Sequence, residues 1–179
     1  ESKLINRGFF SRFINNRPHI TVKSAISLDG KISLKNGDSK WITSISAREN
    51  NQYNRASASA ILTTSNTILA DNPKLNVRLK KIITKIYKQP DLIVLDDKLR
   101  IPTSMNIFSI PNRKIYIFTS KKITNKLKLN YKQNVHLLNV SKKNNLLNLD
   151  KLMTRLSDLE INEIFVEAGS KLISNLLDE

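Results

Sequence analysis

Short apolar runs separated by longer polar stretches recur along the chain from residue 18 onward. Apolar runs without alternation are typical of strands that are buried on both faces of a parallel sheet. The runs are also too short for buried helices, which need ten or more residues. On this basis we predict strands over residues 19–26, 60–63, 92–95, 115–119, 135–140 and 163–167.

The polar stretches between these runs carry helix signals. Ser46 and Glu49 have the spacing of a capping box, which predicts a helix start there. Helices are predicted over residues 46–57, 65–70, 147–159 and 171–177. Because alternating strands and helices form right-handed βαβ units, the predicted fold is an α/β domain of three layers around a mostly parallel sheet.

The first 17 residues differ from the rest of the chain. They are polar apart from one apolar group around Phe9 and Phe13, and Pro18 separates them from the first predicted strand. We interpret residues 1–17 as a connector from a preceding domain and residues 18–179 as the domain itself. A length of 179 residues fits one domain with a core of its own.

The cysteine and histidine content limits the chemistry. There is no cysteine, which excludes disulfides, thiol catalysis and Cys-ligated zinc and favours a reducing cytoplasm. His19 and His136 lie in separate strand-like runs, so neither is expected to bind a metal ion. No apolar run is long enough to cross a membrane. We therefore expect a cytoplasmic protein with no metal ion and no membrane contact.

The net charge of +15 and the pI of about 10.1 are those of many nucleic-acid-binding proteins. Here, however, the lysines are scattered and accompany many Asn and Ile residues, and all three types share A/T-rich codons. Aromatic residues are few and are not interleaved with the basic ones, as base stacking would require. Base composition is thus the favoured explanation, although a basic surface would also attract an anionic substrate.

Four glycines are too few for the usual phosphate-binding loops. Gly8, Gly30, Gly37 and Gly169 match neither the G-x-G-x-x-G spacing nor a P-loop. A standard Rossmann site and a Walker site are both excluded. A phosphorylated cofactor would have to be bound in another way.

Polar residues gather where the predicted strands end, which is where open α/β sheets bind their ligands. Arg55 and Arg78 are candidates to clamp a phosphate group. Gly169, between a strand and a helix, leaves main-chain N–H groups available for an anion. Each feature alone has a structural explanation, because turns and solvated arginines are common. Their order and spacing along the chain, taken together, say more about function than any one of them alone.

That order resembles the reductase domain of the bifunctional riboflavin-biosynthesis deaminase/reductase family. The motifs that carry the resemblance are Ser27-Leu-Asp-Gly-Lys31, Gly37-Asp-Ser-Lys-Trp-Ile-Thr43, Ala47-Arg48, Arg55-Ala56, Ala60-Ile-Leu62, Thr67, Asp71-Asn-Pro73, Leu75, Val77-Arg78 and Val166-Glu-Ala-Gly169. The resemblance is dense over residues 18–78 and thin over residues 80–160. It implies a dihydrofolate reductase-like fold. Because the family continues into a further pair of strands, it also implies a domain that is incomplete at its C-terminal end.

The activity implied by the resemblance is the NADPH-dependent reduction of 5-amino-6-(5-phosphoribosylamino)uracil to its ribityl form. The implied partners are this small phosphorylated pyrimidine, a separate deaminase polypeptide and a second copy of the chain in a homodimer. The family's substrate contacts fall on Ser39, Arg55, Leu75, Arg78 and Glu167. Its cofactor contacts fall on Ala25, Trp41, Thr67, Asp71, Asp97, Gly169, Ser170, Lys171, Leu172, Ile173, Ser174 and Asn175.

Two details of the implied site stay open. Lys23 and Asp71 are the candidate catalytic residues, as proton donors. Asp97 stands where the family has a small hydroxyl residue, and its carboxylate would repel cofactor phosphates unless it faced a ribose hydroxyl.

Alternative functions were weighed against this one. A related pterin reductase would leave the paired arginines with less to bind. A basic domain that binds nucleic acid without turnover is the non-enzyme alternative. A zinc deaminase is excluded, because neither H-x-E nor P-C-x-x-C occurs in the sequence.

Overall fold

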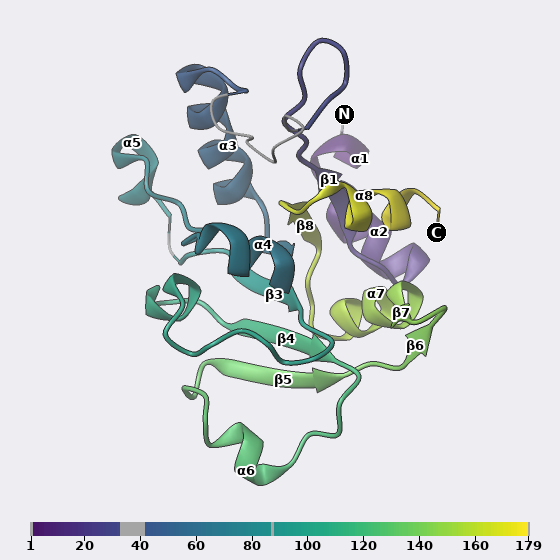
Figure 1. The fold of residues 1–179 in the computed structure, drawn as a ribbon. Coiled ribbons are helices and arrows are strands. Elements are labelled where there is room, and N and C mark those ends of the chain that lie inside the picture. The colour runs from purple at the N-terminus through teal and green to yellow at the C-terminus, as the bar shows by residue number, and fades with distance from the viewer. Residues whose placement is uncertain (1, 33–41, 87, 179) are drawn as a thin grey trace.

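Six parallel strands form one sheet at the centre of the structure (Figure 1). This computed structural model describes residues 2–32, 42–86 and 88–178. In spatial order the strands are β1 (His19–Val22), β8 (Glu163–Val166), β2 (Ala60–Thr64), β3 (Asp91–Leu95), β4 (Ile115–Thr119) and β5 (Val135–Asn139). All six predicted strands are thus confirmed, and the bounds of β4 are those predicted.

The last strand in the sequence lies between the first two. β8 pairs with β1 through His19↔Glu163 and with β2 through Ala60↔Ile164. The prediction that β1 extends to residue 26 is wrong. β1 is an edge strand with β8 as its neighbour, and the pairing ends once the Lys23 N–H has donated to the Val166 carbonyl. This insertion brings the carboxyl ends of β1, β8, β2 and β3 to one edge of the sheet.

Helices cover both faces of the sheet, as the prediction of three layers requires. One face packs against α7 (Leu149–Asp158) and α8 (Ser170–Leu177), through residues such as Leu152 and Leu172. The other face packs against α4 (Ser65–Asp71) and the 3₁₀ helix η1 (Asn106–Ser109), which supply Ile68 and Ile107. Alternation along each strand separates the two cores: Leu62 faces the first and Ile61 the second.

Helix α3 (Ile45–Ser57) is different, because its buried side chains are Gln52 and Arg55 rather than apolar residues. Its start corrects the predicted capping box. The N-cap is Ser44, whose hydroxyl accepts from the Ala47 N–H at 3.1 Å, so the helix begins one residue before Ser46. Both serines lie at the start of the same polar helix, and the sequence pattern does not show which of them is the N-cap. A polar buried face on a helix indicates that α3 supports a site more than a core.

Several short elements were not predicted. β6 (Lys142–Lys143) and β7 (Leu146–Leu147) form an antiparallel hairpin in a Lys/Asn-rich stretch. Its turn residues Asn144 and Asn145 both have positive φ, 52° and 62°, which Asn adopts more readily than most residues and which suits a two-residue hairpin. Two single-turn helices, α5 (Lys80–Ile83) and α6 (Asn125–Lys128), are too short to show periodicity.

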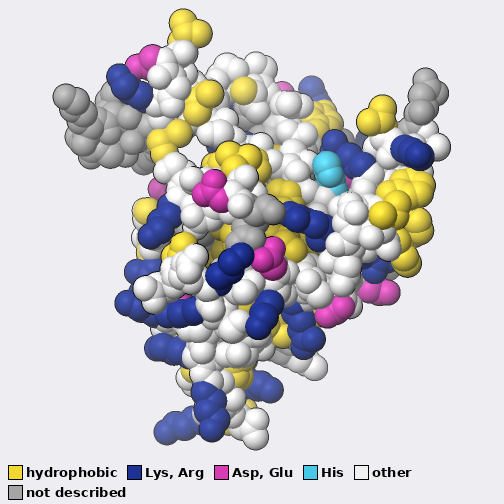
Figure 2. All heavy atoms as spheres, turned by 90° about the vertical axis from the view of Figure 1, so that its right-hand side faces the viewer, with side chains coloured by type: hydrophobic (Ala, Val, Ile, Leu, Met, Phe, Trp, Pro, Cys, Tyr) yellow, Lys and Arg dark blue, Asp and Glu magenta, His cyan; other side chains and the backbone are white. Residues whose placement is uncertain are grey.

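The N-terminal segment that was interpreted as a connector contains two helices, α1 (Ser2–Ile5) and α2 (Arg7–Asn15). Gly8 of α2 is buried against Asn162 and Glu163, at the start of β8. No helix within residues 2–32, 42–86 and 88–178 is long and apolar enough to cross a membrane. Figure 2 shows Lys and Arg side chains spread over one face of the molecule rather than gathered in one patch.

The contact at Gly8 leads to a first prediction. A Cβ at this position would overlap Cγ of Glu163 and lie 2.9 Å from the Asn162 carbonyl oxygen. Because that oxygen belongs to the main chain, α2 must move away from the sheet, and we expect Gly8→Ala to destabilise the fold by about 1–3 kcal/mol. Urea unfolding measures the change. Asn15→Ala, at the exposed end of the same helix, is the control and should stay within about 0.5 kcal/mol. Equal effects of the two substitutions would contradict the packing described.

Candidate active site

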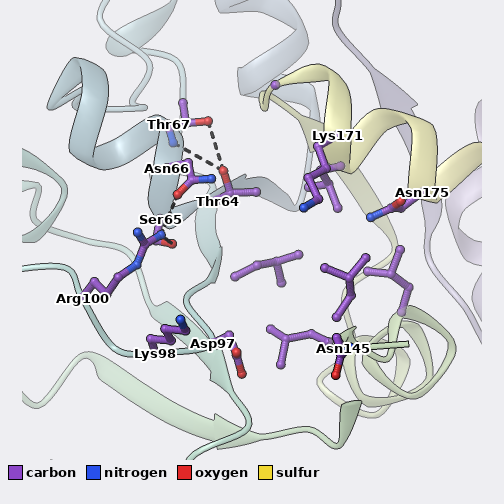
Figure 3. A pocket seen from close by; sticks show the side chains of 16 residues that line it. Thr64, Ser65, Asn66, Thr67, Asp97, Lys98, Arg100, Asn145, Lys171 and Asn175 are labelled. Atoms are coloured by element: carbon purple, nitrogen blue, oxygen red, sulfur yellow. Dashed lines mark hydrogen bonds between the residues drawn. The ribbon is translucent and has the colours of Figure 1, made fainter. Parts of the chain in front are cut away.

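A cavity of about 490 Å³ opens at the carboxyl edge of the sheet (Figure 3). Four parts of the chain surround it: the β2–α4 junction, the loop after β3, the β6–β7 hairpin and the start of α8. The residues that line it are Thr64, Ser65, Asn66, Thr67, Leu95, Asp97, Lys98, Arg100, Asn145, Leu146, Leu147, Leu149, Gly169, Lys171, Leu172 and Asn175. Six of the residues predicted to contact a cofactor are among them.

The first wall is the β2–α4 junction. Thr64 ends β2 and caps α4, accepting from the Thr67 N–H at 3.4 Å, and the two hydroxyl oxygens lie 3.2 Å apart. Threonine suits this position because its extended main chain can end the strand while its hydroxyl caps the helix. The junction therefore fixes the hydroxyl of Thr67, a predicted cofactor contact, beside the cavity (Figure 3).

The second wall is the loop after β3, which brings two cations that were not predicted, Lys98 and Arg100. Arg100 is held by α4: its Nη2 donates to Ser65 Oγ at 2.9 Å and to Asn66 Oδ1 at 2.6 Å. The loop turns tightly, with Leu99 at a φ of 51°. Both cations follow the carboxyl end of a predicted strand. That position was the sequence feature from which their place in the site could have been predicted.

Asp97 lies in the same loop, and its negative charge is balanced by a lysine of the β6–β7 hairpin. Its carboxylate pairs with Lys142 Nζ at 2.7 Å and accepts a hydrogen bond from the Ser120 hydroxyl. Burial acts to raise the pKa of Asp97, but the hydrogen bonds from Lys142 and Ser120 outweigh it and hold the pKa below its usual value. Asp97 therefore stays ionised beside the positive charge of Lys142. This pairing offsets the repulsion between the Asp97 carboxylate and cofactor phosphates that the sequence led us to expect.

The third wall is the start of α8. Gly169 is its N-cap, and a Cβ there would meet no atom within 4 Å. Lys171, Leu172 and Asn175 line the cavity because helical spacing places them on one face. Ser170, Ile173 and Ser174 belong to the same predicted cofactor segment but are not among the lining residues. In Figure 3 the side chain of Lys171 points into the cavity.

Two predicted substrate residues, Arg55 and Glu167, meet in a partly buried ion pair. Arg55 Nε lies 2.5 Å from Glu167 Oε1, and its Nη2 lies 3.0 Å from Oε2; the two side chains are 8% and 11% exposed. Asn51 Nδ2 adds a third hydrogen bond to Oε2 at 3.2 Å. The Arg55 guanidinium is thus already bound to a carboxylate, and the phosphate clamp of Arg55 with Arg78 stays a prediction.

The other predicted substrate residues, Leu75 and Arg78, lie in the loop after α4. Leu75 is buried and has a φ of 47°, whereas the Arg78 side chain is exposed. Arg78 lines a second cavity, of about 500 Å³, next to Asn76 and Lys88. Leu75 and Arg78 thus lie outside the first cavity, and their roles stay predictions.

Three predicted residues lie at the margins of this arrangement. Lys23 and Ala25 follow β1 and are half-buried, and Asp71 is exposed at the last residue of α4. None of the three lines the first cavity. Ser39 and Trp41 lie outside the described residues. Within the residues described, no group of three or more His, Asp and Glu side chains is placed to hold a metal ion.

These features define a three-layer α/β domain with a ligand cavity at the carboxyl edge of its parallel sheet. The chain belongs to the RibD C-terminal domain family, which matches residues 18–179. The three-layer, dihydrofolate reductase-like fold predicted from the resemblance is confirmed.

Relatives and solved structures agree with this assignment. Riboflavin biosynthesis protein RibD of Buchnera aphidicola subsp. Baizongia pistaciae is 38% identical over an alignment 187 residues long, which covers 99% of this chain and 49% of that protein. A 5-amino-6-(5-phosphoribosylamino)uracil reductase of Buchnera aphidicola subsp. Acyrthosiphon pisum is 37% identical over 155 residues, 81% of this chain and 72% of the relative.

A solved structure shows the same architecture. The Thermotoga maritima diaminohydroxyphosphoribosylaminopyrimidine deaminase/5-amino-6-(5-phosphoribosylamino)uracil reductase superposes with a TM-score of 0.77 and 29% identity, over 96% of this chain and 45% of that one. The chain thus spans about half the length of the RibD proteins it matches.

The Arg55–Glu167 pair leads to a second prediction. Arg55→Leu leaves the carboxylate of Glu167 partly buried without its cation, so we expect a loss of about 3 kcal/mol in the free energy of unfolding. Urea unfolding at neutral pH checks this. Arg155→Leu is the matched control, because its partner Asp158 is 3.9 Å away and both side chains are more than half exposed, at 57% and 54%. The control should lose less than about 1 kcal/mol. A loss for Arg55→Leu no larger than for Arg155→Leu would contradict the ion pair's structural importance.

Proposed function

We propose that the chain catalyses the NADPH-dependent reduction of 5-amino-6-(5-phosphoribosylamino)uracil to the ribitylamino compound in riboflavin biosynthesis. One observation carries this proposal: a cavity with three cationic side chains lies beside the Arg55–Glu167 pair, at the edge where open α/β sheets bind ligands. The reductase of Buchnera aphidicola subsp. Acyrthosiphon pisum, which this chain matches over 72% of that protein's length, supports the same activity.

The cavity suits a phosphorylated dinucleotide. Lys98, Arg100 and Lys171 supply positive charge, and Asp97 is offset by Lys142. Gly169 leaves the start of α8 uncovered, so main-chain N–H groups there are open to an anion. An excess of positive charge favours NADPH over NADH, because the 2′-phosphate adds negative charge. When bound, the cofactor supplies a hydride.

Glu167 and Asn51 would orient the acceptor end of the substrate. Glu167 lies two residues before Gly169, so the ion pair and the cofactor cavity share one short segment. The acceptor is C1 of the ribosyl group in its ring-opened imine form. That carbon gains the hydride and the imine nitrogen gains a proton, which leaves a ribityl chain. Lys23 and Asp71 are the proposed proton donors, and catalysis consists mainly of positioning.

The proposal includes two protein partners. A separate deaminase polypeptide would produce the substrate, and the Thermotoga maritima deaminase/reductase, whose name combines both activities, supports that pairing. A homodimer is the second proposed assembly.

The direct test follows NADPH oxidation at 340 nm with the ribosylamino-pyrimidine phosphate, made in place by a separately expressed deaminase. We expect turnover that depends on both substrate and NADPH. Failure to oxidise NADPH at saturating cofactor would overturn the proposed activity.

A matched pair of variants tests the cofactor site. Arg100→Gln removes one cation from the cavity, and a charge-assisted hydrogen bond contributes about 1.5–3 kcal/mol, so we expect the Kd for NADPH to rise about tenfold or more. Lys128→Gln, in exposed α6, should change this Kd less than about twofold. Fluorescence titration measures both. Equal effects would contradict the placement of the cofactor.

A further inference from the structure

The loop at residues 74–78 is held by side chains that come from distant parts of the chain. We refer to it as the 74–78 loop. It has no helix or strand of its own, yet its main-chain groups are bound by four side chains: Gln52, Arg55, Gln89 and Arg113. These side chains fix the conformation of the loop, which has none of the main-chain hydrogen bonds of a helix or a sheet.

Arg113 makes the most unusual of these contacts. It is 4% exposed; its Nη1 donates to the Leu75 carbonyl at 2.7 Å, and its Nη2 donates to the carbonyls of Lys74 at 3.1 Å and Ile107 at 2.8 Å. Desolvation, with the nearby charge of Arg55, lowers the pKa of Arg113 to about 10, so it remains a cation at neutral pH.

The burial of Arg113 is difficult to explain by stability alone. In the part of the chain that the structure describes, no carboxylate forms an ion pair with it, and its Nε has no hydrogen-bond partner. A buried charge of this kind costs free energy that an apolar side chain would not. What Arg113 does provide is a planar fork that spans two successive carbonyls of the loop.

The loop needs such restraint because Leu75 is in the left-handed region, at a φ of 47°. A branched side chain is strained there, and strain persists only where the surroundings impose it. Beyond Leu75, Gln89 binds both main-chain groups of Val77: its Oε1 accepts from the N–H at 2.8 Å and its Nε2 donates to the carbonyl at 3.1 Å. Gln52 Oε1 then accepts from the Arg78 N–H at 2.8 Å.

The loop is also joined to the ion pair of the candidate site. Arg55 binds Glu167 with one edge of its guanidinium and donates from Nη1 to the Asn76 carbonyl at 2.8 Å. At the end of the loop, the Arg78 side chain is exposed, and no ion pair to it occurs among the described residues. The network thus fixes the main chain at the position from which the exposed Arg78 side chain extends.

We propose that Arg113 and Gln89 are positioning residues for substrate binding, and that they hold the 74–78 loop so that Arg78 meets the anionic group of the substrate. This inference rests on the proposed function. It predicts an effect on the substrate and not on the cofactor, because the network does not include the residues that line the cofactor cavity.

The test compares Arg113→Lys and Gln89→Leu with Arg78→Ala. We expect each of the three to raise the KM for the substrate about tenfold, with kcat changed less, and to leave the Kd for NADPH within about twofold. Isothermal titration of the ribosylamino-pyrimidine phosphate into the protein should give the same loss without any turnover. Thermal unfolding of every variant verifies that it is folded; if Arg113→Lys does not fold, Gln89→Leu carries the test.

The double variant Gln89→Leu/Arg78→Ala separates positioning from a general structural role. If the network acts through Arg78, the double variant should bind substrate no worse than Arg78→Ala alone, because coupled residues are not additive. Fully additive losses, or losses of substrate and NADPH affinity alike in folded variants, would overturn the inference while leaving the proposed function intact. An unmodified protein that neither binds nor reduces the substrate would overturn both.

Discussion

The ion pair between Arg55 and Glu167 joins the parts of the chain that form the candidate site. Arg55 comes from α3, and Glu167 directly follows β8. The pair is about nine-tenths buried, so each charge depends on the other to remain inside the protein. The same guanidinium also binds the loop that carries Leu75 and Arg78. The lining of the cavity begins at Gly169, two residues beyond Glu167, so one interaction links both parts of the candidate site.

The position of β8 makes this interaction possible. Because the last strand is inserted between β1 and β2, residues near position 167 meet residues near positions 55 and 64 at the same edge of the sheet. Parallel strands place their carboxyl ends together, and ligands of open α/β sheets bind there. The fold therefore places a cavity with cationic side chains at this edge without a glycine-rich loop. Its positive charge comes from Lys98 and Arg100 in the loop after β3 and from Lys171 in α8.

Much of this arrangement was predictable from the sequence, and the remainder was not for identifiable reasons. Continuous apolar runs located all six strands. The family resemblance implied that Thr67, Asp97, Gly169 and Lys171 contact a cofactor; all four line the cavity, and the contact itself stays a prediction. Arg113 was missed because a side chain that binds main-chain carbonyls leaves no spacing signal. The pairing of Arg55 with Glu167, across 112 residues, was also not predictable, because no sequence pattern links two positions so far apart. The hairpin at Asn144–Asn145 was not predicted, because Asn is common in both loops and hairpins.

The central claim is that the chain transfers a hydride from a nicotinamide cofactor to the ribosyl carbon of its substrate. The most direct measurement uses NADPH carrying deuterium at both C4 positions of the nicotinamide and analyses the product by mass spectrometry. The account predicts a ribitylamino product that contains one deuterium, bound to C1 of the ribityl chain. A product without deuterium at that carbon, or no product in the presence of folded protein and both ligands, would contradict it.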